Sequence, residues 1–461
     1  MRCAKLSLFL FVQRGMKADI IVIGGGASGL MAAYGAATSM VRSGRDVSVT
    51  VLEKMPRPGR KIMITGKGRC NFSNIKEWSD FCTHIRTNPQ FVKPAFFNLD
   101  PEHLVGFFRS AGMDSVVERG ERAFTASHLA SDVVDALVRA CLGAGVKIET
   151  GSEVADISFT GDSDNKKASG FQIVTSDSRK YSCRKLILAT GGLSYPGTGS
   201  TGDGYVFARK LGHSITPLFP SLTALVPAGY KKQEGNSSLR HHIGRSVPLS
   251  TKGEALCGVK LKNVGLQLLI EGSVAQDEFG DVDFTDGGIE GPLGFKVSRK
   301  AVKALVNGSR VSLVLDLKPG VAAEELGTRI RELWAAIAAD PRSRNIGERE
   351  KYRILLGKLM PRELVRPFAD AHPAINPKAI VAGLKAWVFD VEGFVGYERA
   401  VVTAGGISTG EVVAKTLESR LVPGLHFCGE VLDIDCDTGG YNLHTAFSTG
   451  FLAGQAAAAS L

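Results

Sequence analysis

Three glycines near the N-terminal end of the chain have the spacing of a dinucleotide-binding turn. Gly24, Gly26 and Gly29 form a G-x-G-x-x-G pattern after the apolar run Ile20 to Ile23, and an alanine-rich stretch continues to about Met40. In such a pattern the first glycine permits a tight turn, the second lets the backbone approach a pyrophosphate, and the third lets helix pack on strand. The helix start then offers unpaired N–H groups and a positive dipole end to a diphosphate.

An acid completes this unit. A second apolar run, Val47 to Leu52, ends in Glu53, which lies 24 residues after Gly29. A carboxylate at this place accepts hydrogen bonds from both ribose hydroxyls and repels a 2′-phosphate. A glycine-rich turn of another α/β sheet would explain the glycines but not Glu53. The order of strand, turn, helix, strand and acid therefore predicts a dinucleotide site, with NAD and FAD both open.

A basic, glycine-rich segment follows at residues 53–74, and we expect it to be a loop and not a helix. Its five cations are Arg57, Arg60, Lys61, Lys67 and Arg69. Cations on such a backbone can neutralise a diphosphate and approach a large planar ring. The alternative interpretation is a solvated basic loop.

The C-terminal segment repeats the combination of a strand, an acid and glycines. Leu425 to Cys428 is expected as a strand that ends at Gly429-Glu430, and Gly439 to Asn442 as a turn before a helix of small residues to about Ala459. An acid at a strand end can hold the hydroxyls of a ribitol chain, and the helix N-terminus would favour a reduced, anionic flavin. The alternative is a helix that packs on the sheet through its glycines.

The elements between these ends predict a doubly wound α/β sheet interrupted by an insert. The expected elements of the sheet are a helix at 131–142, strands at 146–149, 153–157 and 185–189, the turn Thr190-Gly191-Gly192 and a helix at 204–211. From about Pro217 to Phe394 the pattern changes to short strands at 265–270, 282–284 and 310–317. A helix marked by Leu326, Ile330, Leu333 and Ile337, helices near 349–358 and 375–386, and strands from Trp387 follow.

Taken together, the motifs resemble those of the YhiN/BaiN-like bacterial flavoproteins, usually described as NAD(P)/FAD-dependent or aminoacetone-oxidase-like enzymes. The resemblance rests on GGGASGL, GRKIMITGKGRCNFSN, ATGGLSYPGTGSTGDGY, AGGISTGEV and GLHFCGEVLDIDCDTGGYN, in that order from about Lys17. It implies an α/β fold of the glutathione-reductase-type, FAD-binding Rossmann-like class, interrupted by a β-barrel-like insert and a small helical subdomain. The expected divisions are an extension at 1–16, FAD-binding parts at 17–216 and 395–461, the barrel-like insert at 217–320, and its helical and connecting part at 321–394.

The resemblance also implies which residues bind FAD, with Val154 meeting adenine through its backbone. The expected set is Gly24, Gly26, Ala27, Ser28, Gly29, Glu53, Lys54, Arg60, Lys61, Arg69, Cys70, Asn71, Val154, Thr190, Gly191, Gly192, Gly429, Glu430, Gly440, Tyr441, Asn442 and Leu443. The chain departs from the family phrase F-T-H-x-G-x-S-G-P, because Asp286 and Glu290 replace the usual His and Ser. The family's substrate is therefore not carried over through this loop.

Four side chains are candidates for catalysis, each with an alternative. Cys436, before the last helix, is either a flavin-adjacent thiol or a buried inert cysteine, and His444, one turn into that helix, is either an acid or base or a packing residue. Tyr195, after the Thr-Gly-Gly turn, and Asp286, in the insert, are the others. A Ser-His-Asp triad is not expected.

The predicted function is an FAD-dependent oxidoreductase, a nucleotide-binding flavoprotein. We expect hydride to pass between flavin N5 and a small organic substrate bound under the insert. Because no second G-x-G-x-x-G opens a second βαβ unit (the glycines from Gly197 follow a turn), NAD(P)H would dock transiently as donor, or the substrate itself would supply the hydride. A flavoprotein acting on tRNA and a non-enzymatic flavin-binding redox sensor are the alternatives. The substrate, the electron acceptor and the oligomeric state stay open.

Composition limits the setting in which this chemistry takes place. The chain has 461 residues with 44% hydrophobic and 22% charged side chains, a mixture typical of a globular protein with an ample core. Its formal charge of +10 is expected on solvated faces, so nucleic acid is not the expected partner. The eight cysteines contain no C-x-x-C pair, which predicts a reducing, cytoplasmic setting without structural zinc. No apolar stretch is long enough to span a membrane, and residues 1–16 are expected to be a dispensable extension.

Overall fold

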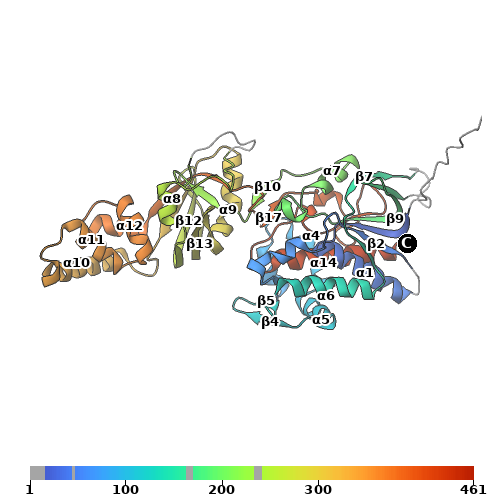
Figure 1. The fold of residues 1–461 in the computed structure, drawn as a ribbon, viewed down its shortest axis with the longest axis horizontal. Coiled ribbons are helices and arrows are strands. Elements are labelled where there is room, and N and C mark those ends of the chain that lie inside the picture. The colour runs from blue at the N-terminus through green and yellow to red at the C-terminus, as the bar shows by residue number, and fades with distance from the viewer. Residues whose placement is uncertain (1–15, 44–46, 162–169, 233–240) are drawn as a thin grey trace, which may run out of the picture. The chain divides into compact units, whose positions relative to one another are not determined.

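The computed structural model describes residues 16–43, 47–161, 170–232 and 241–461, and the extension predicted at the N-terminal end lies almost wholly outside them. The chain divides into two compact units. Unit 1 comprises Met1–Leu193, Gly197–Leu218 and Gly405–Leu461, and unit 2 comprises Ser194–Pro196 and Phe219–Ala404. Figure 1 shows that unit 1 is built from both ends of the sequence, coloured blue and red, with unit 2 inserted between them.

Unit 1 is organised around a mixed sheet in the order β6-β2-β1-β9-β8-β7, and β18 also pairs with β9. The parallel strands are β6 (Lys147–Glu149), β2 (Val49–Leu52), β1 (Met16–Ile23), β9 (Lys180–Leu188) and β18 (Leu425–Phe427). Antiparallel β8 (Phe171–Thr175) and β7 (Val154–Phe159) extend the sheet from β9. Since Ile20 to Ile23 are at most 5% exposed, the apolar run of β1 is explained by burial on both faces.

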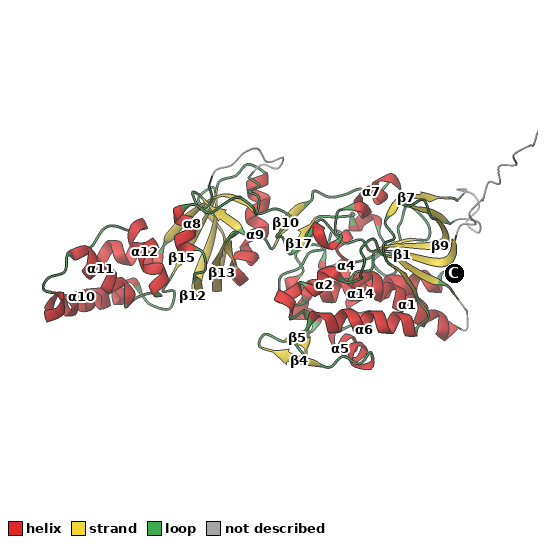
Figure 2. Cartoon of the chain, in the orientation of Figure 1, coloured by secondary structure: helices red, strands yellow, loops and turns green. Residues whose placement is uncertain are grey.

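Three helices pack together beneath this sheet, as Figure 2 shows. They are α1 (Ala27–Ser43), α6 (Ala130–Gly143) and α14 (Tyr441–Ala459), and α1 contacts both of the others. Helix α7 (Asp203–Lys210) follows β9 through the short turn η4 (Pro196–Thr198). These positions confirm the strands and helices that the sequence predicts for the FAD-binding fold.

The expectation of an unstructured loop at 53–74 was wrong. The segment contains α2 (Arg60–Met63), η1 (Thr65–Gly68) and β3 (Asn71–Asn74). Gly59 precedes α2 with a φ of 70°, and buried Ile62 anchors the helix, which contacts α6. One helical turn is too short to show a hydrophobic period, so the glycines and cations dominate the sequence pattern. Likewise, the turn expected at 439–442 ends earlier, because α14 begins at Tyr441.

The remaining elements of unit 1 surround this arrangement. Antiparallel β3, β5 (Arg122–Thr125) and β4 (Ser115–Glu118) form a small sheet. The other short elements are α3 (Trp78–Phe81), η2 (Cys82–His84), α4 (Pro89–Asn98), α5 (Pro101–Ser110), η6 (Thr409–Glu411) and η7 (Gly429–Val431). Of these, η7 lies directly after β18, at the carboxyl end of a parallel strand.

Unit 2 is a closed barrel with a helical part, as the sequence predicts. The barrel strands, in order, are β11 (Leu225–Pro227), β14 (Gly288–Glu290), β13 (Ser273–Thr285), β12 (Lys260–Ile270), β15 (Val311–Asp316) and β16 (Trp387–Phe394). Its helices are α8 (Thr251–Leu256), α9 (Gly291–Val306), α10 (Ala323–Ala339), α11 (Glu348–Gly357), α12 (Arg362–Ala371) and α13 (Pro377–Lys385), and β10 (Phe219–Ser221) pairs with β17 (Val402–Ala404). A single hydrophobic core runs from the barrel into the helices, with Leu326, Ile330 and Ile337 of α10 buried in it.

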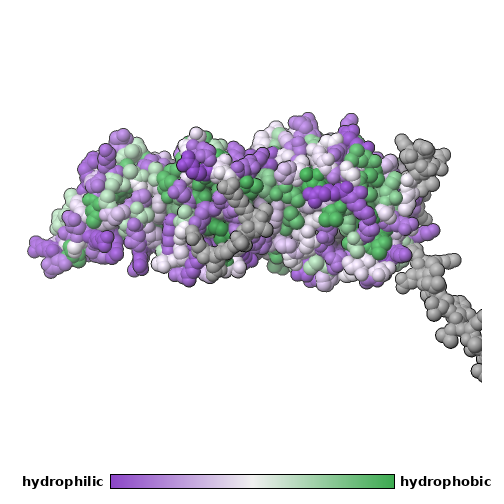
Figure 3. Space-filling view, turned by 90° about the horizontal axis from the view of Figure 1, so that it is seen from above, coloured by the Kyte–Doolittle hydropathy of each residue, from purple (hydrophilic) through white to green (hydrophobic). Residues whose placement is uncertain are grey.

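Within the part of the chain described here, no helix is long and apolar enough to cross a membrane. On the face drawn in Figure 3, hydrophilic and hydrophobic residues are interspersed, with hydrophilic ones prominent.

Candidate functional site

The glycines of the first turn are required for different reasons. Gly24 has a φ of 105°, and a Cβ there would lie 2.5 Å from the Ala189 carbonyl oxygen. A Cβ on Gly29 would lie 1.8 Å from the Gly24 carbonyl oxygen. A Cβ on Gly26, in contrast, would meet no described atom within 4 Å. The fold itself therefore requires glycine at two of these positions, whereas Gly26 leaves an open backbone beside the first turn of α1, which fits the close approach of a diphosphate.

Glu53 follows the last residue of β2 and is held by backbone donors. The Gly25 N–H donates to Glu53 Oε2 at 2.6 Å, and the Met55 N–H donates to Oε1 at 2.7 Å. Burial raises the pKa of this carboxyl, while the two N–H donors, Lys54 and Arg60 act in the opposite direction. The side chain thus reaches back to the glycine turn and retains lone pairs for further donors.

The C-terminal helix joins the glycine turn through close backbone contact. A Cβ on Gly450 of α14 would lie 2.2 Å from the Ser28 carbonyl oxygen, and one on Gly454 would lie 2.0 Å from the Ala32 carbonyl oxygen. Gly429, with a φ of 75°, approaches the same turn, since its Cβ would lie 2.4 Å from Ser28 Oγ. The glycines of α14 therefore pack against α1, and not on the sheet as the alternative interpretation expected. This packing also brings the segment after β18 to the beginning of α1.

Four predicted segments follow the carboxyl ends of neighbouring parallel strands. Gly24 directly follows β1, and Glu53 directly follows β2. One residue separates Thr190 from the end of β9, and one separates Gly429 from the end of β18. In an open α/β sheet, ligands bind at this edge of the strands. Sequence segments more than 400 residues apart thus meet at the edge where a dinucleotide is expected.

The four basic residues of the expected FAD-binding set differ in their surroundings. Lys61 Nζ lies 2.7 Å from Glu430 Oε2, and Lys54 Nζ lies 2.6 Å from Asp203 Oδ2, so both connect this edge to other segments of unit 1. Arg60 is exposed at the start of α2. Arg69 instead pairs with Glu118 and lies 4.8 Å from the centre of the Phe124 ring, on the small sheet.

Other residues of the expected FAD-binding set lie in β7, in the turn after β9 and, for Cys70, in the core. Val154 begins β7, close to Ser152, whose N–H donates to the Glu53 carbonyl at 2.8 Å. Gly191, with a φ of 72°, and Gly192 continue the turn after β9, and a Cβ on Gly204 would lie 2.1 Å from Thr190 Oγ1. Cys70 is fully buried in the unit 1 core, and burial raises the pKa of its thiol to about 12. Its side chain is therefore a packing group of the core.

The loop before α14 lies beside an unsatisfied acceptor on β3. Gly439 and Gly440 have φ values of 124° and 95°. Asn442 fixes the loop, since its Oδ1 accepts from the Cys436 N–H at 2.9 Å and its Nδ2 donates to the Cys436 carbonyl at 2.9 Å. A Cβ on Gly440 would lie 2.8 Å from Asn71 Oδ1, a buried atom without a hydrogen-bond partner among the described residues. An orphaned acceptor beside two glycines fits a ligand that brings its own donor, as the N3–H of a flavin ring does.

Cys436 and His444, the two candidate catalytic residues in unit 1, are both buried. Burial raises the pKa of the Cys436 thiol, whose Sγ lies 3.6 Å from Thr445 Oγ1. Burial lowers the pKa of His444 to about 3; its Nδ1 lies 3.0 Å from Ser73 Oγ, and its ring packs on Phe81 and Phe96. These surroundings favour the structural alternative for both side chains.

The candidates Tyr195 and Asp286 belong to unit 2. Tyr195 has a φ of 53°, and its N–H donates to the Tyr397 carbonyl at 2.8 Å. Asp286 Oδ1 lies 2.6 Å from Arg399 Nη1, and Glu290 also pairs with this guanidinium. Both residues that depart from the family phrase therefore share one arginine. Burial raises the pKa of Tyr195, and Arg399 and Glu290 act on it in opposite directions.

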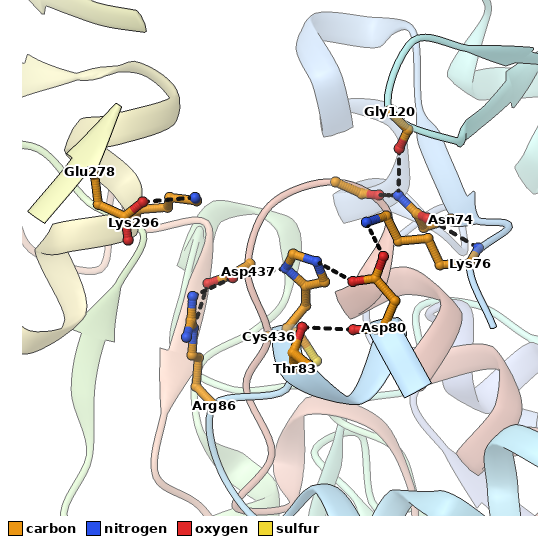
Figure 4. A network of polar contacts seen from close by, with 12 residues as sticks. Asn74, Lys76, Asp80, Thr83, Arg86, Gly120, Glu278, Lys296, Cys436 and Asp437 are labelled. Carbon is orange, nitrogen blue, oxygen red and sulfur yellow. Dashed lines mark hydrogen bonds and ion pairs between the residues drawn. The ribbon is translucent and has the colours of Figure 1, made fainter. Parts of the chain in front are cut away.

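Sequence reasoning missed a polar network beside the loop before α14. Arg86 donates from Nε to Asp437 Oδ1 at 2.6 Å (Figure 4). His84 Nδ1 lies 3.1 Å from Asp437 Oδ2. The run DIDCD contains Asp437, but nothing in the sequence indicates that this acid pairs with His84 and Arg86, more than 350 positions earlier. Over the described ranges, no group of three or more His, Cys, Asp or Glu side chains is placed to hold a metal ion.

The chain is similar to known proteins over nearly its whole length. The family model described as HI0933-like protein Rossmann domain matches residues 18–456. The chain is 32% identical over 448 residues to the 3-dehydro-bile acid delta(4,6)-reductase of Clostridium scindens, covering 95% of this chain and 98% of that protein. It is 30% identical over 441 residues to a ribosomal RNA dihydrouridine synthase of Haemophilus influenzae, covering 94% and 96%. Among solved structures, a 3-ketosteroid-delta4-(5alpha)-dehydrogenase from Rhodococcus jostii is 15% identical, with a TM-score of 0.46 and coverage of 97% and 98%.

Proposed function

Because the chain belongs to the HI0933-like family and is an FAD-dependent oxidoreductase, we propose that it reduces a carbon–carbon double bond conjugated to a carbonyl group. Hydride would pass from reduced flavin N5 to the β-carbon of a small organic substrate, and a proton would reach the α-carbon. The carbonyl makes the β-carbon electrophilic, which is why this class of double bond accepts hydride.

The names of the relatives support this reaction class. One relative is named for reduction of delta(4,6) double bonds in a 3-dehydro-bile acid, and others are named for making dihydrouridine in ribosomal RNA. A 3-oxo group and the uracil carbonyl are each conjugated to the double bond that such a reaction removes. The shared chemistry is therefore a better proposal for this chain than either named substrate.

The observation that carries the proposal is the meeting of four segments at the carboxyl edge of β1, β2, β9 and β18. In the proposed complex, the N–H groups beside Gly26 hold the diphosphate, and Glu53 accepts from the ribose hydroxyls. Glu430 and its partner Lys61 lie at the ribitol, and the orphaned Asn71 oxygen accepts a proton donor of the ring. The positive end of α14 favours negative charge on the reduced ring. The other expected contacts, Ala27, Tyr441 and Leu443 among them, belong to the same proposal.

The electron donor is proposed to be NADH or NADPH, which would bind transiently. A second candidate function, reduction of uridine in RNA, is favoured by one specific observation, the 30% identity to the dihydrouridine synthase over nearly the whole chain. The two candidates use the same flavin and differ in the size of the substrate.

Three measurements on the purified full-length chain test the proposal. Heat-released cofactor should be FAD, and anaerobic NADH or NADPH should bleach the flavin absorbance. Reoxidation by a 3-oxo-4,6-diene steroid should then consume the double bond, as followed by loss of its ultraviolet absorbance. Reoxidation by ribosomal RNA with appearance of dihydrouridine would select the second candidate instead. If neither acceptor reoxidises the bleached protein, the proposal that this chain reduces a conjugated carbon–carbon double bond is wrong.

A further inference from the structure

The loop before α14 is paired with an upstream segment by backbone hydrogen bonds. Ile85 and Cys436 form an antiparallel bridge. On either side of it, the Arg86 N–H donates to the Asp435 carbonyl at 2.8 Å, and the Asp437 N–H donates to the His84 carbonyl at 2.9 Å. Residues 84–86 therefore act as a short edge strand for residues 435–437, and we call the two segments together the brace.

Side chains reinforce the brace at Asp437. Its side chain is only 5% exposed, and Arg86 binds both carboxylate oxygens, Oδ1 through Nε and Oδ2 through Nη2 (Figure 4). His84 approaches Oδ2 from another direction, and its ring stacks on Tyr441 at a centroid distance of 4.2 Å. Asp80 lies on the far side of His84 and also pairs with Lys76. The two-point guanidinium contact fixes both the position and the rotation of the Asp437 carboxylate.

The loop that the brace holds contains two glycines with positive φ and is closed by a side chain at each end. Gly439 and Gly440 are both left-handed, which costs conformational entropy when the loop is ordered. Asn442 closes the loop from the helix side, through its bonds to Cys436 and to the Asp437 carbonyl. The Arg86 contact to Asp437 is the corresponding closure from the other side. Between the two closures lies Gly440, beside the unpartnered Asn71 oxygen.

We propose that Arg86 is a positioning residue for the flavin: through Asp437 it keeps the loop 436–440 and the first turn of α14 in the conformation that receives the ring. This inference rests on the proposed function, because it takes the flavin to bind at that loop. Arg86 acts through Asp437 and needs no contact with cofactor or substrate. A loop ordered before binding lowers the entropic cost of association, so its loss weakens affinity.

The test compares three variants of the full-length chain, first stripped of cofactor and then titrated with FAD. Arg86→Ala is expected to raise the FAD dissociation constant at least tenfold, equivalent to about 1.4 kcal/mol, and to change the visible circular dichroism of the bound flavin. Arg86→Lys keeps the charge but not the fork and should recover only part of the affinity. Arg139→Ala is the matched control, because Arg139 also ties two segments of unit 1, through the Ala111 carbonyl, without touching the loop.

The outcomes separate this inference from the function on which it rests. Equal affinity and equal flavin dichroism in wild type and Arg86→Ala would overturn the inference while leaving the flavin site intact. Equal losses in Arg86→Ala and Arg139→Ala would overturn it too, since the effect would then be general destabilisation. If the wild-type chain binds no FAD, the proposed function itself fails. Should Arg86→Ala not fold, the comparison of Arg86→Lys with wild type decides.

Discussion

At the scale of single residues, two glycines of the same motif differ in what a side chain would meet. A side chain at Gly29 would clash with the fold, whereas a side chain at Gly26 would not. The hypothetical Cβ of Gly29 meets the Gly24 carbonyl oxygen at 1.8 Å, whereas that of Gly26 meets nothing within 4 Å. The φ of Gly26 is not in the left-handed region either. The fold therefore does not require glycine at position 26, which is consistent with the proposal that a diphosphate approaches the backbone there.

This difference predicts opposite behaviour for two substitutions in one motif. Gly26→Ala should leave thermal stability unchanged and weaken FAD binding at least tenfold, about 1.4 kcal/mol, because the methyl group occupies the space of the diphosphate. Gly29→Ala should destabilise the protein by about 1–3 kcal/mol or more, because backbone must move. Chemical unfolding of the cofactor-free chain and FAD titration measure the two effects. Unchanged FAD affinity in Gly26→Ala would contradict the assignment of the diphosphate.

The sequence identifies some site residues and not others for a physical reason. Gly24, Gly29 and Glu53 are recognisable because their roles are set by neighbours in the same βαβ unit. Arg86 carries no such signal, since its partner Asp437 lies 351 residues away and any acid brought there by the fold would serve. His444 was open to two interpretations, and only tertiary packing against phenylalanines favours one of them.

At the scale of elements, a seam of small residues between α1 and α14 joins the two ends of the sequence. Gly450 and Gly454 face the Ser28 and Ala32 carbonyl oxygens at distances that no Cβ tolerates. Gly35 of α1 is equally close to Phe451 on α14, where a Cβ would lie 2.7 Å from the carbonyl oxygen. Glycine inside a helix lowers helix stability relative to alanine. Its presence on both α1 and α14 therefore indicates that the close packing of the two helices against each other offsets this cost.

Gly454→Ala should therefore separate the helices and destabilise the chain by about 1–3 kcal/mol. It should also lower FAD occupancy, because α14 carries the loop at Gly440 away from the glycine turn. Gly106→Ala is the control, since Gly106 lies in α5 with nothing within 4 Å of its Cβ, and should stabilise by up to about 1 kcal/mol through helix propensity. Equal unfolding free energies for the two variants would refute the seam.

Element prediction succeeded where a hydrophobic pattern was long. The buried run of β1, the apolar stripe of α10 and the barrel strands β15 and β16 lie where the sequence indicates. Of β12 and β13 the sequence indicates only part, and the three-residue strands β11 and β14 were not predicted. The segment 53–74 was assigned wrongly, because α2 spans four residues and is stabilised by Ile62 packing toward α6 rather than by its own period.

At the scale of the whole molecule, unit 1 closes on itself independently of the insert. The Thr216 N–H donates to the Gly406 carbonyl at 2.8 Å, and the Gly406 N–H donates to Thr216 Oγ1 at 3.0 Å. A Cβ on Gly405 would lie 2.2 Å from the Pro217 carbonyl oxygen. Apart from Ser194–Pro196, which belong to unit 2, the chain thus leaves unit 1 and returns to it at the same place, with the polypeptide of β10 through β17 between.

Replacing residues 219–404 by a short glycine link should therefore leave unit 1 able to fold and to bind FAD within about tenfold of the full-length affinity, about 1.4 kcal/mol. If unit 2 supplies the substrate contacts, the same variant should lose reoxidation by the enone or by RNA while NADH or NADPH still bleaches it. FAD titration and anaerobic stopped-flow spectroscopy separate these two properties. A folded but colourless variant would show that the flavin needs unit 2, and a variant that retains turnover would place substrate recognition in unit 1. Because the glycine seam and the Thr216–Gly406 closure are both internal to unit 1, we expect neither outcome.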